Sequence, residues 1–504
     1  MRNKRFFLTQ LLKLAFQLPL YLLLFVTFFY ILSTTNPQII NLSRTAATTI
    51  ATFAVILSLL TFVYGGYQIG EKKLRSVFSS ILIATLFTDV ITYLQLQIMN
   101  VNPANNDYLV LGGEDLFLLF IVMILQIALI YIFVSVGYRL YFKINPPQQC
   151  CIITSSQELA IHVAEKIASF RQKFKLCDVV HYECDDIKDT IRRHDTIFLA
   201  GIPDTEEGEL QNFCYRRNKT IYLLAELEDV IISTSENSIL DDTPFLYIHR
   251  VEPTLFQLFI KRFIDVTISL LGLVIFSPVM LLAAASIFFS DRGPIFFYQE
   301  RATLHGKIFQ IIKFRTMYVH SDRTEDESFS VKENDSRITP LGRILRKYRI
   351  DELPQLYNVL RGDMSIVGPR PEMLPNIEKY EMEVPEFKYR QQMKAGLTGL
   401  AQIDGKYNTT PKDKAILDLL YIENFSIASD LRLILRTLTI FFRRDSTEGF
   451  ANSKRKAVCP KMRTEPLPAE PTADAASPAD QSSKRPYARQ SKKKSADSLS
   501  KTKS

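Results

Sequence analysis

Four long apolar runs dominate the first 140 residues of the chain. They cover residues 14–32, 48–64, 77–99 and 116–137. Each run is long enough to cross roughly 30 Å of hydrocarbon as an α-helix, and a soluble domain rarely needs four such runs in succession. The pattern therefore predicts a transmembrane domain of four helices over residues 1–145.

The charged residues between these runs predict their orientation. Cations lie before the first run, between the second and third, and after the fourth: Arg2, Lys4, Arg5, Lys13, Lys72, Lys73, Arg75, Arg139 and Lys143. The loop over residues 100–115 has none. Because short loops rich in Lys and Arg stay in the cytoplasm, both ends of this bundle are expected there. A secretory signal is the alternative reading of the basic start, but no small-residue cleavage site follows the first run.

From residue 146 to 252, short apolar runs alternate with amphipathic ones. The segments CCIITSS, DTIFLAGI and TIYLLAEL predict strands, and ELAIHVAEKIASF predicts a helix. This alternation is typical of a small Rossmann-like α/β domain with a parallel sheet. The turn at residues 154–157 lacks the glycines that let a backbone approach a pyrophosphate. A degenerate domain with a structural or regulatory role is therefore favoured over a nucleotide site.

A fifth apolar run, residues 263–289, carries Ser277 and Pro278 near its middle. Proline removes a backbone donor and breaks or kinks a helix, and the Ser277 hydroxyl could satisfy the carbonyl that the proline frees. A full crossing would place the cations after Arg292 outside the cell, against the usual charge bias. We therefore favour a re-entrant helix over about residues 261–290, with a kinked spanning helix as the alternative.

Two further segments suggest phosphate chemistry. Apolar residues alternate over residues 308–314 and predict a strand with Lys313 and Arg315 at one end. Arginine offers a planar donor fork and lysine a point charge, and both suit phosphate. Each cation alone could be a solvated surface charge. Their recurrence beside a membrane segment favours phosphate binding.

The second segment is KYRIDELPQL, in which Asp351 and Glu352 stand side by side. Helical spacing of the apolar residues predicts a helix that begins here, with Asp351 near its N-cap, and stops at Gly362. Acids at a helix start bond free amides and complement the helix dipole, which is a complete structural account. The preceding cations also favour an ionised carboxylate beside an arriving phosphate. Such a carboxylate can attack phosphorus.

Composition and charge change this picture mainly at the end of the chain. Residues 448–504 hold 13 Lys or Arg and 6 Asp or Glu, which accounts for +7 of the net charge of +8. The rest is close to neutral, which argues against a nucleic-acid-binding core. The Pro, Ala, Ser and Lys content predicts a disordered basic tail attracted to anionic lipid. The six cysteines form no CxxC pair, so a zinc or disulfide framework is not expected.

Three motifs, in order, carry a family resemblance: KFRTM, LGRILRKYRIDELPQLYNVLRGDMSIVGPRP and AGLTGLAQIDG. Behind a Ser-Pro-broken apolar helix, they closely resemble the bacterial sugar transferases, which are monotopic polyprenol-phosphate phosphoglycosyl transferases. The resemblance covers about residues 255–443, within a catalytic domain expected at 253–447. The preceding α/β domain and four helices look like the long form of that family, similar to undecaprenyl-phosphate glucose or galactose phosphotransferases.

The resemblance implies an activity, a cofactor and a site. Members transfer a sugar 1-phosphate from a UDP-sugar to undecaprenyl phosphate, release UMP, and initiate exopolysaccharide, capsule or O-antigen synthesis. Asp351 matches the nucleophile that forms a covalent aspartyl intermediate, and Glu352 completes the dyad. Both are candidate ligands for the Mg2+ that the family requires. The positions implied to bind phosphate or nucleotide are Lys313, Arg315, Arg346, Arg370 and Gln402.

The sequence departs from the family pattern at three positions, and two other functions stay open. Thr303 stands where the family usually has glycine, Ala395 where it has proline, and Lys406 where it has arginine. The first two touch loop rigidity, and the third removes a bidentate fork. A conventional glycosyltransferase that releases UDP and a catalytically silent membrane scaffold or sensor are the alternatives. The expected location is the bacterial inner membrane with the catalytic domain on its cytoplasmic face; a homodimer is left open.

Overall fold

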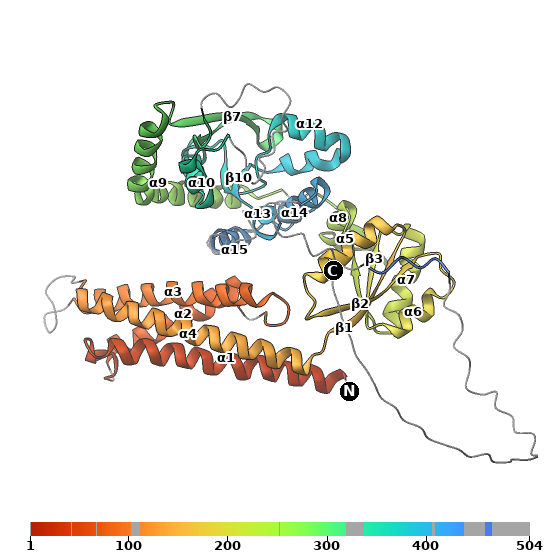
Figure 1. Ribbon diagram of the computed structural model, residues 1–504, viewed down its shortest axis with the longest axis horizontal. Helices are drawn as coiled ribbons and strands as arrows, with labels where there is room; N and C mark the ends of the chain where they lie inside the picture. The colour runs from red at the N-terminus through yellow and green to blue at the C-terminus, as the bar shows by residue number, and fades with distance from the viewer. Residues whose placement is uncertain are drawn as a thin grey trace, which may run out of the picture.

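The computed structural model describes residues 2–41, 43–66, 68–101, 111–250, 252–318, 337–405, 409–437 and 459–465, without the side chains of residues 2–6 and 291. Lys406 and most of the predicted basic tail lie outside these residues. Figure 1 shows a helical bundle, a small α/β domain at one end of it, and the part from α9 to α15 above it.

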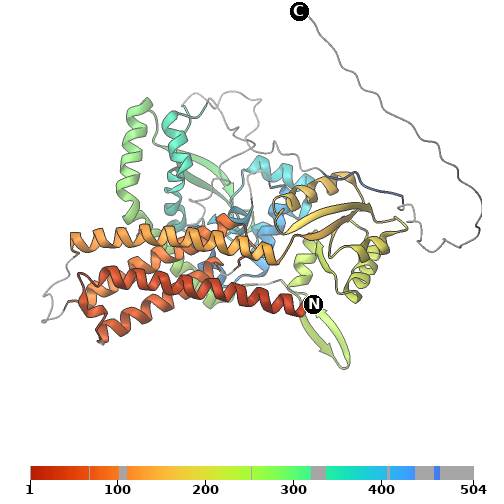
Figure 2. The ribbon, with the colours of Figure 1, turned by 60° about the horizontal axis from the view of Figure 1, so that its bottom comes forward.

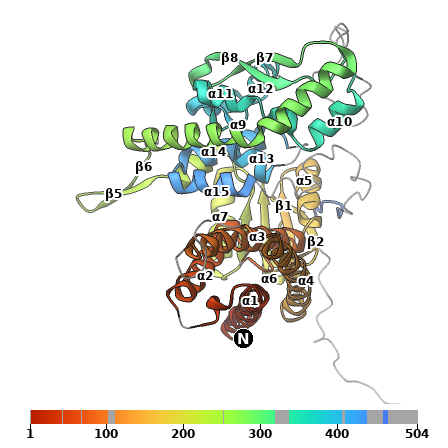
Figure 3. The ribbon, with the colours of Figure 1, turned by 90° about the vertical axis from the view of Figure 1, so that its left-hand side faces the viewer.

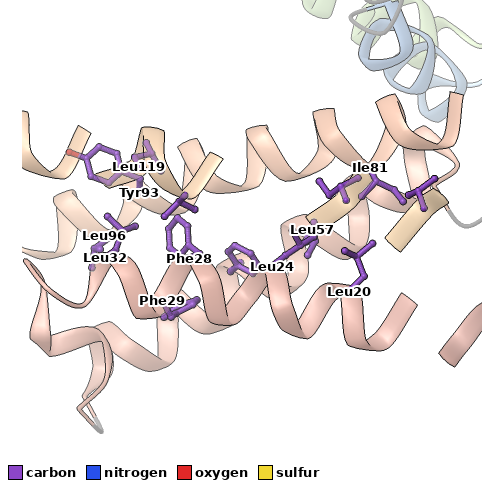
Figure 4. Close-up of a cluster of buried hydrophobic side chains, with 14 of the residues drawn as sticks. Leu20, Leu24, Phe28, Phe29, Leu32, Leu57, Ile81, Tyr93, Leu96 and Leu119 are labelled. Atoms are coloured by element: carbon purple, nitrogen blue, oxygen red, sulfur yellow. The ribbon is translucent and has the colours of Figure 1, made fainter. Parts of the chain in front are cut away.

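The four apolar runs at the start of the chain form four helices. These are α1 (Arg2–Leu32), α2 (Arg44–Tyr64), α3 (Leu74–Met99) and α4 (Gly113–Ile144), with a 3-10 turn, η1, at Pro37–Ile39. Together with α9 (Leu255–Asp291), they are the helices in the described ranges that are long and apolar enough to cross a membrane. Figure 4 shows side chains such as Leu24, Phe28 and Leu96 meeting between them.

The second part contains the predicted parallel sheet. Its strands are β1 (Gln148–Thr154), β2 (Phe174–His181), β3 (Thr196–Ala200) and β4 (Thr220–Leu223), in the order β2-β1-β3-β4 and all parallel. The helices are α5 (Gln157–Ala168), α6 (Ile187–Arg193), α7 (Asp204–Arg216) and α8 (Leu227–Ser233). The three predicted strands and the predicted helix are confirmed. The edge strand β2 was not predicted, because its polar residues break the apolar pattern.

A hairpin follows α8. Strands β5 (Glu236–Leu240) and β6 (Thr243–Tyr247) pair antiparallel. Figure 2 and Figure 3 show it extending away from the rest of the chain, and most of its side chains are exposed.

Helix α9 carries the Ser-Pro pair inside one continuous helix, and it changes direction along its length (Figure 1). Pro278 cannot donate to the carbonyl of Val274, four residues earlier, because proline has no N–H. The Ser277 Oγ donates to that carbonyl at 2.7 Å instead. The predicted role of the serine hydroxyl is confirmed.

Both arms of α9 contact the same following unit. Before Pro278, the Arg262 guanidinium donates to the carbonyls of Val359 and Leu360, each at 2.6 Å. After it, Ala283 and Ile287 pack in one buried cluster with Phe314 and Leu345.

The unit after α9 places two small sheets among short helices. Strands β7 (Phe296–Ala302) and β8 (Ile308–Phe314) are antiparallel, and β9 (Ser365–Val367) and β10 (Gly396–Thr398) are parallel. The helical elements are η2 (Leu304–Gly306), α10 (Pro340–Lys347), η4 (Ile350–Glu352), α11 (Gln355–Arg361), α12 (Leu374–Glu383), η5 (Pro385–Gln392), α13 (Leu400–Asp404), α14 (Pro411–Glu423) and α15 (Ile427–Thr437). The predicted strand at 308–314 is confirmed as β8. Its Phe309 and Ile311 share a buried core with Leu356 and Val359 of α11.

Apolar contacts join this unit to both preceding parts. Leu227 and Val230 of α8 pack with Ala415 and Leu419 of α14. Leu435 of α15 packs against a cluster from α2 and α3 (Leu60, Tyr64, Ile83 and Ala84). The segment from α9 onward therefore lies against both the α/β domain and the helical bundle.

Candidate active site

The acidic pair does not begin a helix as the spacing predicted. Helix α10 ends at Lys347, and Arg349 takes a left-handed backbone conformation with φ of 53°. The chain then makes the 3-10 turn η4, and α11 begins only at Gln355 behind Pro354. The acids therefore lie in a 3-10 turn of their own, and Pro354 is the N-cap of α11. The stop at Gly362 is confirmed, because this residue caps α11 with a φ of 97°.

Glu352 lies at the centre of a cationic cluster. Its Oε1 accepts from Arg370 Nη2 at 2.8 Å and lies 3.6 Å from Lys313 Nζ, and its Oε2 lies 3.5 Å from Arg349 Nη1. Burial alone would raise the pKa of Glu352, but Arg370, Lys313 and Arg349 hold that pKa well below its usual range. Glu352 is thus a fixed anion at neutral pH.

Asp351 differs from its neighbour. Among the described residues, no hydrogen bond or ion pair reaches its carboxylate, and the residue is half-buried. Burial and the adjacent Glu352 charge raise the pKa of Asp351 to about 6, against the opposing effect of Lys313, Arg346 and Arg370. The cations favour the ionised form of Asp351, as expected, but burial and the Glu352 charge outweigh them. Near neutral pH most of the Asp351 carboxyl is still ionised, and its oxygens have no partner among the residues that the structure describes.

Local packing places the cations predicted from the motifs. A Cβ on Gly342 would lie 2.1 Å from the Thr316 carbonyl oxygen, so only glycine lets α10 approach the chain after β8 this closely. Arg346 on α10 then donates from Nε to Thr316 Oγ1 at 2.8 Å. Arg315, next to Thr316, is 9% exposed. Lys313 at the end of β8 and Arg346 on α10 both lower the pKa of Asp351.

Sequence reasoning missed Asn358, which fixes the distance between the acids and β8. The side chain is fully buried; its Nδ2 donates to the Gln310 carbonyl at 2.8 Å, and its Oδ1 accepts from the Ile312 amide at 3.0 Å. These bonds hold α11 against the strand that carries Lys313. The motif holds this asparagine, but spacing alone does not reveal that an amide in α11 bonds a strand backbone.

A second missed group supports Arg370. Arg390 is 6% exposed and donates to the Arg370 carbonyl at 2.8 Å. Its charge is balanced by Asp418 at 2.7 Å and Glu372 at 3.8 Å. Arg390 and Glu372 also line a cavity together with Arg370. Because Arg390 lies outside the recognised motifs, no signal in the sequence pointed to it.

Two departures from the family pattern meet at the same cavity. Thr303 and Ala395 both line it, and the Ala395 amide donates to Thr303 Oγ1 at 3.1 Å. The same hydroxyl donates to the Asp363 carbonyl at 3.0 Å. Glycine at 303 would remove the acceptor and proline at 395 the donor. The two unusual residues therefore form one interaction.

Gln402 is not joined to the acidic pair by any hydrogen bond within the described part of the chain. It lies on α13, and its Nε2 is buried without a hydrogen-bond partner there. Its predicted contact with substrate stays a prediction. The structure does bring Lys313 and Arg370 to the acids and Arg346 to the end of β8.

The sequence that forms this site matches known proteins. Residues 256–444 match the model of a family described as bacterial sugar transferase. A UDP-glucose:undecaprenyl-phosphate glucose-1-phosphate transferase of Caulobacter vibrioides is 41% identical over 191 residues, which cover 37% of this chain and 71% of that protein. The chain belongs to the bacterial sugar transferase family. The matched segment contains the acids, all the predicted cations and α9 after its first residue.

Longer members of the bacterial sugar transferase family match over a smaller share of their length. A UDP-N-acetylgalactosamine-undecaprenyl-phosphate N-acetylgalactosaminephosphotransferase of Aeromonas hydrophila is 31% identical over 252 residues, 49% of this chain and 58% of that protein. An undecaprenyl-phosphate galactose phosphotransferase of Salmonella typhimurium is 36% identical over 200 residues, 37% of this chain and 41% of that protein. The chain thus spans about half the length of these two relatives.

Proposed function

We propose that this protein transfers a sugar 1-phosphate from a UDP-sugar to undecaprenyl phosphate and so begins the synthesis of a bacterial surface polysaccharide. Family membership supports the reaction class, and the named relatives act on UDP-glucose, UDP-N-acetylgalactosamine or undecaprenyl phosphate. The relatives' names differ in the sugar, so the proposal does not specify the sugar.

The observation that carries the proposal is the unequal environment of the two acids. Three cations surround Glu352, whereas the Asp351 carboxylate has no partner among the described residues. A carboxylate with unpaired oxygens is a better nucleophile than one engaged in ion pairs. We infer that Asp351 attacks and that Glu352 holds the cations that receive the phosphates.

In the first step, an Asp351 oxygen attacks the β-phosphorus of the UDP-sugar. The new bond joins that oxygen to phosphorus, and the bond from phosphorus to the bridging oxygen breaks, so that UMP leaves with the bridging oxygen and its electron pair. In the second step, a phosphate oxygen of undecaprenyl phosphate attacks the same phosphorus. The acyl phosphate bond breaks, Asp351 is regenerated as a carboxylate, and the product is polyprenyl diphosphate sugar.

The chain's own groups assist these steps electrostatically. Lys313 and Arg370 are positioned by β8, Asn358 and Arg390, so they are held near the acids before substrate arrives. Preorganised cations of this kind stabilise charge that develops on transferring phosphoryl groups. Because Glu352 balances their charge, these buried cations are paired before substrate binds.

The residues also fit a magnesium ion by the chemistry of their donors. Magnesium binds through one or two carboxylates plus substrate phosphate oxygens. Beside Glu352, the Asp351 carboxylate oxygens have no partner in the part of the chain that the structure describes. We propose that Asp351 would hold the ion, with Glu352 as the second candidate ligand. When bound, magnesium would supply positive charge to the pyrophosphate.

The two arms of α9 support a re-entrant rather than a spanning helix. Arg262 and Ile287, on either side of Pro278, contact the same unit. A helix that crossed the bilayer would place these two positions on opposite sides. We propose that α9 enters and leaves from one face, the cytoplasmic face of the inner membrane, so that a lipid phosphate can meet a soluble nucleotide at the acids.

The decisive experiment follows UMP release from a panel of UDP-sugars, with purified protein in lipid nanodiscs, undecaprenyl phosphate and magnesium. Asp351→Asn should abolish UMP release and the acceptor-free transfer of radiolabelled sugar phosphate to the protein. Glu378→Gln makes the same acid-to-amide change at an exposed position and should leave both intact. Release of UDP without UMP would indicate a conventional glycosyltransferase. Full polymer synthesis in cells carrying Asp351→Asn would indicate a scaffold or sensor.

A further inference from the structure

The outer edge of β2 is covered by a segment from the far end of the chain. Residues 459–465 lie beside β2 and α5 in Figure 3, where they form the short blue segment. Arg463 pairs in parallel with Val180: its amide donates to the Val179 carbonyl and its carbonyl accepts from the His181 amide, both at 2.9 Å. These residues lie in the tail that composition predicts to be disordered, and the structure differs from that expectation here.

The Arg463 guanidinium donates hydrogen bonds to two side chains at this edge. Its Nη1 donates to Asp186 Oδ2 at 2.6 Å, and its Nη2 donates to Thr190 Oγ1 at 3.0 Å. Both side chains of the ion pair are shielded, with Arg463 20% and Asp186 16% exposed. A guanidinium fork suits a carboxylate and a hydroxyl held side by side, whereas an ammonium would engage them one at a time.

Apolar contacts accompany the polar ones. Cys459 and Met462 are the only cysteine and the only methionine in residues 448–504. Both pack against the buried cluster that includes Ile152 and Val163 of the α/β domain. The Met462 amide also donates to Gln157 Oε1 at 2.8 Å, at the start of α5.

We propose that the outer edge of β2 is a peptide-docking site whose occupant is the chain's own segment 459–465. An unpaired sheet edge exposes backbone groups that can recruit another strand, and adding an extended peptide satisfies them. Backbone hydrogen bonds at Arg463 hold the segment on β2. Two side-chain contacts give the site its specificity: the Arg463 guanidinium bonds Asp186 and Thr190, and Met462 packs in the apolar cluster. Neither the family match, which ends at residue 444, nor the proposed reaction involves this site.

Docking ties three parts of the chain together. The segment follows the transferase unit in sequence but binds the α/β domain, which already contacts that unit through α8 and α14. Because the segment is tethered, its binding is intramolecular and benefits from a high effective concentration. Occupancy of β2 therefore limits how far the α/β domain can move from the transferase unit.

Hydrogen exchange at the His181 amide tests the proposal on the full chain in lipid nanodiscs, with the amides of β1 as internal reference. Ending the chain at residue 458, or changing Arg463→Ala, should speed exchange at His181 relative to β1 by about tenfold or more. Lys461→Ala removes an exposed cation from the same segment and should change nothing. Unchanged His181 exchange in the shortened chain would overturn the proposal.

A synthetic peptide supplies the second arm. The peptide of residues 456–468, added at millimolar concentration to the shortened chain, should restore protection of His181, and the same peptide with Arg463→Ala should not. Equal rescue by both peptides, or rescue by neither, would overturn recognition through Arg463. If protection of the His181 amide in the full chain falls when the protein is diluted, the segment on β2 comes from a second copy of the chain. That result would overturn docking within one chain.

Discussion

Two turns in this molecule precede a helix, where a phosphate can bind. They differ in whether their polar side chains already have partners. At the turn from β1 to α5, Ser156 accepts from the Leu159 amide at 3.3 Å and Thr154 Oγ1 accepts from the Ser156 amide at 3.4 Å. At the turn η4, cations surround Glu352, while the Asp351 carboxylate has no partner within the described part of the chain. In the first turn the polar side chains bond backbone amides of the same turn. In the second turn one reactive carboxylate remains available to a substrate. Polar groups without partners, rather than a turn before a helix, distinguish the chemical site from the structural one.

After Asp351→Asn, the largest effect is expected from removing the cation that bonds Glu352 most closely. Arg370→Ala should lower the rate of UMP release by about 100-fold or more, as for loss of one preorganised charge donor. Lys388→Ala, at an exposed position of η5, is the matched loss of a cation and should stay near the unaltered rate. A rate within threefold of the unaltered protein for Arg370→Ala would mean that the cationic cluster is structural.

The pH dependence of acceptor-free labelling should report Asp351. Its raised pKa of about 6 means that the carboxyl becomes protonated, and loses its nucleophilicity, as the pH falls through 6. The labelling rate should then fall tenfold per pH unit. Glu352→Gln removes the neighbouring negative charge that raises this pKa, so the acid limb should move to lower pH. An acid limb that stays in place in Glu352→Gln would contradict the coupling between the two acids.

A smaller effect is expected at the hydrogen bond between Thr303 and Ala395. Thr303→Gly and Ala395→Pro should each lower the temperature of half-inactivation, because each leaves a buried partner unsatisfied. The double variant should cost about 1 kcal/mol less than the sum of the single variants, because that sum counts the bond between the two residues twice. The stability of the two single variants and the double variant is measured by thermal inactivation in nanodiscs. If the two single losses add up to the loss in the double variant, residues 303 and 395 do not interact.

The smallest effect is expected at the self-satisfied turn. Ser156→Ala removes the cap of α5 and should destabilise the α/β domain by about 1 kcal/mol. The KM for the UDP-sugar and the turnover number should not change. An altered KM in Ser156→Ala would break the comparison between the two turns and indicate a ligand in the α/β domain.

Much of the architecture could be read from local patterns. The apolar runs became helices α1 to α4 and α9, and alternation located β1, β3, β4 and β8, because burial in lipid or in a sheet imposes a short-range periodicity. Patterns failed where a contact overrides them. Arg349 in a left-handed conformation separates α10 from the acids, which lie in the turn η4 and not in α11. Strand β2 carries polar residues that its edge position tolerates.

Some residues of the candidate site could likewise be predicted from the sequence, and others could not. The motifs supplied Asp351, Glu352, Lys313, Arg346 and Arg370, but they did not show which acid the cations would hold. Asn358 and Arg390 were missed because their partners, the backbone of β8 and the Arg370 carbonyl, are distant in sequence. A polar side chain shows its role only when its partner is known.

The sequence by itself determined the apolar helices, the parallel sheet and the family, since these follow from composition, period and motif within short windows. Tertiary structure alone decided that Glu352 receives the cations while Asp351 has no partner in the described ranges, and that Arg463 pairs with β2. The physical reason is that charge pairing and edge-strand pairing depend on distances between groups far apart in the chain. Local propensity carries no information about those distances.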